Sequence, residues 1–367
     1  MTLALVLAGL LPVASAAAVP CVTVTPDGAR RCYSTIQAAV DAAPNGATIN
    51  ISPGTYVEQV TIYNKTLTVY GNGTTVRAPS TTRATVTYGE LTRPAIIGVV
   101  YLNVDIRNLT VDGANSLESN PGLFGIAFQN SNGSVKETVV QNVGFGQPRP
   151  PRESGYPEGT GIAAGVWEED SDSGPYSVTI AGNIISNYNI YGIYVLGGWR
   201  NREGTSQLRA VVRNNWVVGS GPTDQSRQIG ISFSGNGRIE QNTISNHFFT
   251  RAMFNTPDTC GIQVRTFSGN QIIGNTLTNN EVGICADGRY PNRPVPVVLD
   301  GNRVSGPAPG ASGYTGVRLR FEEGNTVELR NTAFSNLATG LFSWPGSTIT
   351  QSDNTFSGVT TPVRINE

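Results

Sequence analysis

Short stretches in which apolar and polar residues alternate, separated by turn residues, run through most of the chain. In one such stretch Ile262 and Val264 alternate with Gln263 and Arg265. A period of two is that of a strand with one buried face. The pattern therefore predicts an all-β protein built from many short strands.

Two motifs recur within this pattern. The first is an asparagine inside an apolar stretch, at intervals of 23 to 41 residues: Asn108, Asn142, Asn183, Asn215, Asn242, Asn275, Asn302, Asn331 and Asn354. The second is a glycine followed by an aliphatic residue, at Gly125, Gly192, Gly230, Gly261, Gly283, Gly316 and Gly340. Gly161 and Gly165 are both candidates for the one remaining place in this series. Recurrence on this scale is typical of a solenoid.

We expect two strands and one winding of the chain per repeat, which gives a single parallel β-helix of roughly 9–11 turns. Stacked strands lie about 4.8 Å apart, so like residues of successive turns become neighbours. An asparagine at a bend can then hydrogen-bond to the asparagines above and below it, as in cross-β stacks. The asparagine repeat therefore predicts an amide ladder.

One segment near the N-terminus has helical spacing instead. Ile36, Ala39 and Val40 fall on one face of a helix, and Ser34 or Thr35 supplies its N-cap. A solenoid leaves an open strand edge at its first turn, which invites aggregation. We expect this helix to cover that edge.

The N-terminus itself has the pattern of a secretory signal. An apolar run at 3–11 precedes a small-residue stretch at 14–18, and the run is too short to span a bilayer. We expect three parts in the chain: a signal peptide at 1–18, a cap of hairpin and helix at 19–46, and the β-helix at 47–367, whose first strands we place at 47–51 and 57–62. No later segment reaches the roughly 18 apolar residues of a membrane helix, so we expect a secreted protein without a membrane span.

The four cysteines fit export, because disulfides form in oxidising compartments. Cys21 and Cys32 flank a polar turn inside a predicted hairpin, and we expect them to be bonded. Cys260 and Cys285 lie one repeat apart but at different places within it. Both a second disulfide and two buried free thiols remain open for this pair.

Composition excludes several functions. Charged residues make up 14% of the chain and the net charge is -1, which leaves no basic footprint for nucleic acid or an anionic membrane surface. No cysteine–histidine cluster indicates zinc. We expect a monomer that needs no cofactor.

Three stretches resemble secreted right-handed parallel β-helix proteins of the pectin-lyase-like superfamily: STIQAAVDAAPNGATINISPGTYVEQVTI (34–62), LTVDGAN (109–115) and the repeated GNTxSN and GIxV units. The resemblance covers nearly the whole mature chain and implies a right-handed helix. That superfamily includes pectate and alginate lyases, uronan epimerases, polygalacturonases, pectin esterases, tailspikes, adhesins and a copper-processing protein, so the fold does not choose an activity. The catalytic aspartates of the esterases and the His-Gly pair of the polygalacturonases have no match here.

Strand parity predicts an exposed column on the glycine-motif strands, where aromatic and charged side chains would form a groove for an extended sugar chain. Its densest cluster contains Arg265, Asp287, Tyr290, Arg318 and Arg320. Elimination from a uronate needs a cation for the C6 carboxylate, a base for the C5 proton and an acid for the leaving oxygen. Arg318 or Arg320 suits the first role and Tyr290 the acid or base. The alternative is a solvated face with ordinary surface ion pairs.

Residues from other turns and from long loops would contact the substrate: Trp167, Glu169, Tyr194, Trp199, Arg200 and Trp344. The acidic residues Glu169, Asp170 and Asp172 offer oxygen ligands, which makes Ca²⁺ a candidate, with a bare acidic loop as the alternative. His247, expected in a loop, is a further candidate base. A packed or merely exposed histidine is its alternative.

Several functions stay open at this stage. The expected one is interaction with a polysaccharide or cell-wall glycan, and its enzymatic version is lyase or epimerase chemistry on an acidic, uronate-containing chain. A non-catalytic adhesion or structural module is the alternative. A metal-loading accessory protein is disfavoured, because one histidine and two methionines are few soft ligands for copper.

Overall fold

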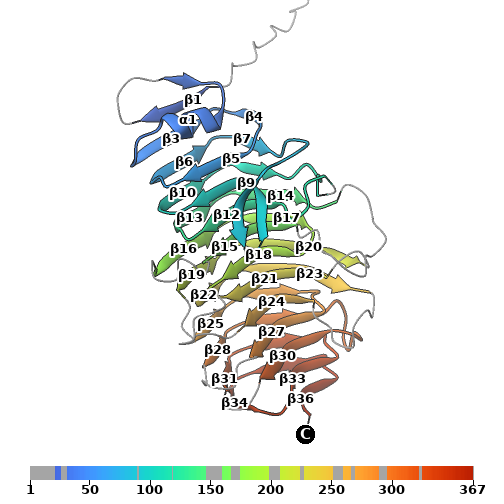
Figure 1. Cartoon of the computed structure of the whole chain (residues 1–367). Coiled ribbons are helices and arrows are strands. Elements are labelled where there is room, and N and C mark those ends of the chain that lie inside the picture. The colour runs from blue at the N-terminus through green and yellow to red at the C-terminus, as the bar shows by residue number, and fades with distance from the viewer. Residues whose placement is uncertain are drawn as a thin grey trace, which may run out of the picture.

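The computed structural model describes residues 21–25, 31–88, 91–117, 119–145, 159–166, 174–197, 207–223, 227–250, 259–265, 269–288, 296–321 and 325–366. Three long parallel sheets run side by side along the molecule, and the chain passes from one to the next before it starts another turn (Figure 1). This is the right-handed parallel β-helix that the sequence predicts. Each turn contains three strands, so the predicted two per repeat was wrong.

Eleven strands from each sheet form the turns within the described residues, which agrees with the predicted number of turns. Sheet A contains β3 (Ala47–Ile51), β6 (Leu67–Gly71), β10 (Asn103–Arg107), β13 (Asn132–Lys136), β16 (Tyr176–Ala181), β19 (Leu208–Arg213), β22 (Asn236–Glu240), β25 (Asn270–Ile273), β28 (Val297–Asp300), β31 (Asn325–Arg330) and β34 (Ser347–Ser352). Sheet B contains β4 (Gly54–Val57), β7 (Thr74–Arg77), β11 (Thr110–Asp112), β14 (Val139–Val143), β17 (Ile184–Tyr188), β20 (Trp216–Thr223), β23 (Thr243–Phe249), β26 (Thr276–Thr278), β29 (Arg303–Ser305), β32 (Ala333–Ser335) and β35 (Thr355–Ser357). Sheet C contains β5 (Val60–Tyr63), β9 (Leu91–Val100), β12 (Phe124–Gln129), β15 (Thr160–Gly165), β18 (Tyr191–Leu196), β21 (Ile229–Ser234), β24 (Cys260–Arg265), β27 (Val282–Gly288), β30 (Thr315–Phe321), β33 (Thr339–Ser343) and β36 (Thr361–Ile365).

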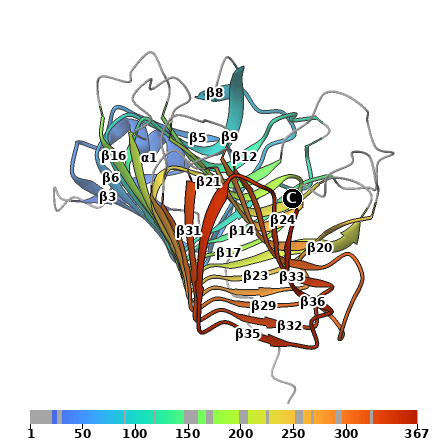
Figure 2. The same ribbon diagram turned by 90° about the horizontal axis from the view of Figure 1, so that it is seen from below.

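Additional elements lie at the N-terminal end and outside sheet C. Strands β1 (Val22–Thr25) and β2 (Cys32–Tyr33) extend sheet A in antiparallel fashion, and the predicted Cys21–Cys32 disulfide is formed. Helix α1 (Ile36–Ala42) begins after Thr35, whose Oγ1 accepts a hydrogen bond from the amide of Ala38 at 3.1 Å. The strand predicted at 57–62 is divided between β4 and β5. Strand β8 (Ala84–Tyr88) pairs with β9 and stands outside the ring of three sheets (Figure 2).

The core is a stack of aliphatic residues that repeat at the same position of every turn. In sheet A one inward position carries only Ile, Val and Leu over ten turns, all at most 2% exposed: Ile49, Val69, Ile106, Val135, Ile180, Val212, Ile239, Ile272, Leu299 and Leu329. Burying each such side chain contributes about 1.5–3 kcal/mol to folding. The strand alternation of the sequence therefore has the expected cause.

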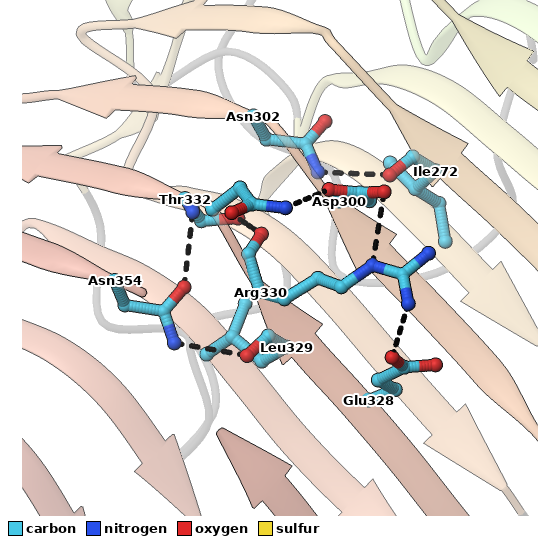
Figure 3. A network of polar contacts seen from close by, with 9 residues as sticks. Ile272, Asp300, Asn302, Glu328, Leu329, Arg330, Thr332 and Asn354 are labelled. Atoms are coloured by element: carbon cyan, nitrogen blue, oxygen red, sulfur yellow. Dashed lines mark hydrogen bonds and ion pairs between the residues drawn. The ribbon is translucent and has the colours of Figure 1, made fainter. Parts of the chain in front are cut away.

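The predicted amide ladder lies at the bend between sheets A and B. Its continuous part consists of five buried residues: Asn183, Asn215, Asn242, Asn275 and Asn302. Each of the first four donates from Nδ2 to the Oδ1 of the next at 2.9 to 3.1 Å. The backbone amide of each of these four donates to the same oxygen at 3.0 Å. Thr332 follows in the next turn, and its amide donates to Asn354 Oδ1 (Figure 3).

Three of the nine predicted ladder asparagines lie elsewhere. Every connection from sheet A to sheet B has two residues, and the first adopts a left-handed conformation in nine successive turns: Asn108, Glu137, Gly182, Asn214, Gln241, Gly274, Gly301, Asn331 and Asp353. Asn108 and Asn331 occupy this first place rather than the ladder, because asparagine tolerates positive φ. Asn142 lies at the end of β14 and donates to Asp112 instead.

The glycine motif also has a steric cause. In sheet C a glycine occurs at the same place in eight successive turns, and Gly161 rather than Gly165 takes the contested position. A Cβ atom at Gly230 would lie 2.5 Å from the carbonyl oxygen of Gly261, and the same close approach recurs from turn to turn. Only glycine allows the chain to enter sheet C this tightly.

Candidate functional site

The outer face of sheet C carries the predicted cluster in register. Arg265 pairs with Asp287 on the next strand, and Asp287 pairs with Arg320 on the strand after it. Their side chains therefore repeat along the axis at about the 4.8 Å spacing of neighbouring strands. Arg318 belongs to the adjacent outward position, between Cys285 and Phe342.

Much of the predicted exposed column is buried, which corrects that expectation. Arg318 is 3% exposed, Gln263 is 5% exposed, and Cys285 and Ser232 are completely covered. Arg265 and Asp287 are half-buried, whereas Arg320 is exposed. Strand parity gives the direction of a side chain, but it does not say what lies over the sheet. The accessible part of the column is therefore limited to its outer charged position.

The N-terminal half of this face is covered by a small second core. Its buried members come from β8, β9 and the next three strands of sheet C: Val86, Ala95, Val100, Phe124, Ala127, Ala163 and Leu196. The amide of Thr87 on β8 donates to Gln129 Oε1 at 2.8 Å, which ties β8 to β12. Tyr194, a predicted substrate contact, packs against this cluster and stacks on Tyr191 with ring centroids 4.6 Å apart.

The C-terminal half of the face is polar and aromatic. Ser232 donates to Gln263 Oε1 at 3.4 Å, and Gln263 Nε2 donates to Asp287 Oδ2 at 3.3 Å, so a buried row of polar groups leads to the carboxylate. The Arg320 guanidinium lies 5.9 Å from the centroid of the Trp344 ring. We call the following set the arginine–aromatic face: Arg265, Asp287, Arg320, Phe342, Trp344 and Arg364.

Two aromatic residues complete this face. Phe342 and Trp344 meet edge to face with centroids 4.4 Å apart, and Arg364 lies 5.4 Å above Phe342. Cation–π contacts of this kind fix an arginine while its outer N–H groups stay available. The sequence predicted Trp344 as a sugar contact but no role for Arg364, which continues the outward position of Phe342 one turn later.

The open question about Cys260 and Cys285 is resolved as a second disulfide. It links β24 to β27 on the outer face of sheet C, and both sulfur-bearing residues are buried together with Val282. Cys285 stands between Gln263 and Arg318 in register. The disulfide therefore lies directly beside the polar row.

Several predicted residues lie outside the described part of the chain: the signal peptide at 1–18, and Trp167, Glu169, Asp170, Asp172, Trp199, Arg200 and Tyr290. Within the described ranges no three His, Cys, Asp or Glu residues are grouped so that they could hold a metal ion. In the same part of the chain no helix is long and apolar enough to cross a membrane.

His247 was expected in a loop, but it lies in β23 and is completely buried. Asn280 donates from Nδ2 to the carbonyl of Ile244, so its Oδ1 faces His247 Nδ1 at 2.7 Å. Nδ1 must therefore carry the proton, and Nε2 accepts from the Tyr188 hydroxyl. Burial lowers the pKa of His247 to about 4 and raises that of Tyr188. This triad belongs to the core, where substrate has no access.

A second charged group lies on the outer face of sheet A (Figure 3). Asp300 accepts from Asn331 Nδ2 at 2.9 Å and from Arg330 Nε at 3.0 Å, and Arg330 also contacts Glu328. The hydrogen bond from Asn331, together with Arg330, lowers the pKa of Asp300. These groups are partly exposed and mutually satisfied, as surface ion pairs usually are, so they form no site.

No protein-family model and no curated protein matches the sequence. Among solved structures, the A-module of the mannuronan C-5 epimerase AlgE4 of Azotobacter vinelandii superposes with a TM-score of 0.52, at 13% identity, over 90% of this chain and 92% of that module. The chain therefore has the same parallel β-helix fold as that module.

Two further pectin-lyase-like structures match less closely. The pectin methylesterase from carrot gives a TM-score of 0.39 at 15% identity, over 93% of this chain and 86% of that one. PfbA, a surface adhesin of Streptococcus pneumoniae, gives 0.41 at 11% identity, over 86% and 83%. At such identities the likeness concerns the pectin-lyase-like fold alone. Function must therefore be argued from the residues of this chain.

Proposed function

We propose that this protein binds an acidic, uronate-containing polysaccharide along the C-terminal half of the outer face of sheet C. The observation that carries the proposal is the register of Arg265, Asp287 and Arg320 in three successive turns, with Trp344 beneath the Arg320 guanidinium. Guanidinium groups form paired, charge-assisted hydrogen bonds to carboxylates. An aromatic ring beside them covers the C–H surface of a sugar.

The spacing of the charges suits a polymer rather than a single sugar. Arg265 and Arg320 lie two strands apart, or roughly 10 Å along the axis, and Arg364 lies two strands beyond Arg320. A chain with repeating carboxylates that runs parallel to the axis can meet these cations in succession. The two disulfides support a secreted protein, since such bonds form and persist in oxidising compartments.

Lyase or epimerase chemistry is the second candidate. The observation that favours it is a carboxylate, Asp287, positioned by Gln263 between two guanidinium groups. In this proposal an arginine neutralises the C6 carboxylate of the uronate and Asp287 removes the C5 proton. The electron pair left at C5 then forms the C4–C5 double bond as the bond from C4 to its oxygen breaks, and the departing oxygen takes a proton from water. Epimerisation instead returns a proton to the other face of C5.

The test of the binding proposal compares two exposed arginines on different faces. We expect Arg320→Ala to weaken binding of polygalacturonate or alginate at least tenfold, which corresponds to about 1.4 kcal/mol. Arg303→Ala, on the exposed face of sheet B, should leave binding unchanged. Isothermal titration calorimetry of the secreted protein measures both. Equal affinity in the wild type and Arg320→Ala would contradict the proposal.

Product analysis separates catalysis from binding. Elimination gives an unsaturated, ultraviolet-absorbing product, and epimerisation changes the uronate composition that NMR detects. We expect Asp287→Asn to abolish either reaction while retaining polysaccharide binding. Binding of polyuronates by the wild type without any product would instead favour an adhesion module.

A further inference from the structure

The outer face of sheet B carries a row of exposed apolar residues that the acidic site does not use. Val139, Ile184 and Trp216 occupy the same outward position in three successive turns. Trp216 is 54% exposed and Ile184 is 43% exposed, whereas Val139 is half-buried. We call these three residues the sheet B row.

The row contrasts with the rest of its own face. On one side the same outward position carries Thr110 and Thr75, and on the other side Thr243 and Thr276. An isolated exposed apolar residue needs no explanation, but three in consecutive turns form a continuous apolar surface. A threonine at position 216 would preserve the strand and avoid exposing an indole ring to water.

Polar groups run parallel to this row. The neighbouring outward position carries Gln141 beside Val139 and Ser186 beside Ile184, and it continues with Val218 beside Trp216. At the adjoining bend the exposed side chain of Asn187 donates to Asn142 at 2.7 Å and to Asn115 at 3.0 Å, which lines up amide groups along the axis. The row therefore has an aromatic plane beside hydrogen-bonding groups of both kinds.

Charge is absent from the surrounding strands. On the strands of sheet B, the charged residues nearest to Trp216 are Asp112 and Arg303. Each lies three strands away, or roughly 14 Å. This holds for all side chains of these strands except that of Thr223, which is not described. The nearest described charges outside sheet B are Lys136, Glu137 and Arg213, which precede the row at its bends and are of both signs. The row itself therefore offers an acidic chain no set of counter-charges, whereas an uncharged chain needs none.

We propose that the sheet B row binds an uncharged polysaccharide, one of whose sugar faces stacks on Trp216. Stacked aromatic rings with flanking amides and hydroxyls satisfy both surfaces of a neutral sugar: its C–H face and its hydroxyl edge. The site is separate from the arginine–aromatic face and does not depend on the function proposed for it. The protein would then hold an acidic and a neutral glycan on two different faces.

The test uses affinity electrophoresis of the full secreted chain in gels containing xyloglucan, hydroxyethylcellulose or galactomannan. We expect at least one of these neutral polymers to retard the wild type. Trp216→Ala should weaken that retardation at least tenfold, and Trp216→Phe should retain most of it, because the ring face is preserved. Arg320→Ala should be retarded like the wild type.

Three results would overturn the proposal. One is that none of the three polymers retards the wild type, and another is equal retardation of Trp216→Ala. The third is a dimer in sedimentation velocity that Trp216→Ala dissociates, because the row would then be covered by a second copy of the chain. Circular dichroism shows whether Trp216→Ala keeps the fold of the wild type. Ile184→Ser is a second variant in which retardation should also be weaker.

Discussion

The outer faces of sheets B and C are built on the same turns, but they meet their surroundings differently. Sheet C is largely covered, with Arg318 and Gln263 buried beneath its surface and accessible charges at Arg265, Asp287, Arg320 and Arg364. Sheet B is more open, with Trp216 exposed and no charged residue on the sheet B strands within two of it. Both sheets enclose the same core of the β-helix, so the difference in exposure arises outside that core.

Connection length accompanies this difference: sheet C borders connections of variable length on both sides, and sheet B on one side. Every connection from sheet A to sheet B has two residues, for example Gly274 and Asn275 between β25 and β26. The connections into and out of sheet C vary widely: β14 ends at Val143 and β15 begins only at Thr160. A tight connection leaves no chain to cover the neighbouring face. Variable segments, the usual place of function on a rigid scaffold, are therefore concentrated around sheet C.

The largest expected effect is a loss of stability of the β-helix itself, on which both faces depend. Asn242→Ala removes the acceptor of the Asn215 backbone amide and the side-chain donor to the carbonyl of Val212. It also removes one of the two hydrogen bonds of Asn215 Nδ2 and one of the two that Asn275 Oδ1 accepts. Each unsatisfied group costs about 1–3 kcal/mol, so we expect a total loss of roughly 3–5 kcal/mol. Denaturant unfolding followed by circular dichroism measures it. Thr243→Ala, the exposed next residue, is the control, and a loss below about 1 kcal/mol for Asn242→Ala would show that the ladder contributes little.

The second-largest expected effect is a loss of stability at acid pH, which arises from His247 in the interior. The pKa of His247 is about 4 in the folded chain and near 6.5 when unfolded, so the unfolded state binds the proton first as pH falls. Stability is therefore full above about pH 6.5, declines between pH 6.5 and 4, and loses up to about 3 kcal/mol. Denaturant unfolding at a series of pH values tests this. His247→Gln should flatten the decline in that window, and an unchanged slope would contradict the assignment.

A smaller effect should separate the two faces in stability. Arg318→Ala removes a buried side chain from sheet C, and we expect a loss of about 2 kcal/mol. Trp216→Ala removes a larger but exposed side chain from sheet B, and its effect should stay within roughly 0.5 kcal/mol. Thermal unfolding of both variants measures the contrast. The reverse order would mean that the exposed row, and not the covered face, stabilises the fold.

The smallest effect concerns salt. The affinity for polygalacturonate should fall severalfold between about 0.05 and 0.5 M salt, because the screening length is shorter at high ionic strength. Binding of a neutral glycan at the sheet B row should hardly change. Calorimetry at both salt concentrations makes the comparison. Equal salt dependence of the two ligands would argue that they share one site.

Repetition explains why so much of the fold could be predicted. A residue such as Asn242 or Gly230 has the same neighbours in each turn, so one local rule applies many times along the sequence. Asn108 and Asn331 were assigned to the ladder wrongly, because spacing alone does not distinguish adjacent positions of a two-residue bend. The pairing of Cys260 with Cys285 was also undecided, since it depends on which strands become neighbours.

The candidate site was predictable only in part, for a related reason. Alternation placed Arg265, Asp287 and Arg320 at one outward position, but it missed the burial of Arg318 and put His247 in a loop. Arg364 had no signal of its own, because nothing in its local sequence marks it as the continuation of the adjacent outward column, that of Arg318 and Phe342.

By itself, the sequence determined the solenoid, the core of its amide ladder and the alternation of inward and outward residues, because these depend on residues that recur every turn. Only the tertiary structure decided which outward residues stay accessible, since β8, which covers part of sheet C, occurs once and is not periodic. The same distinction leaves Trp216 in water and Arg318 under cover, although both belong to outward positions of equivalent strands.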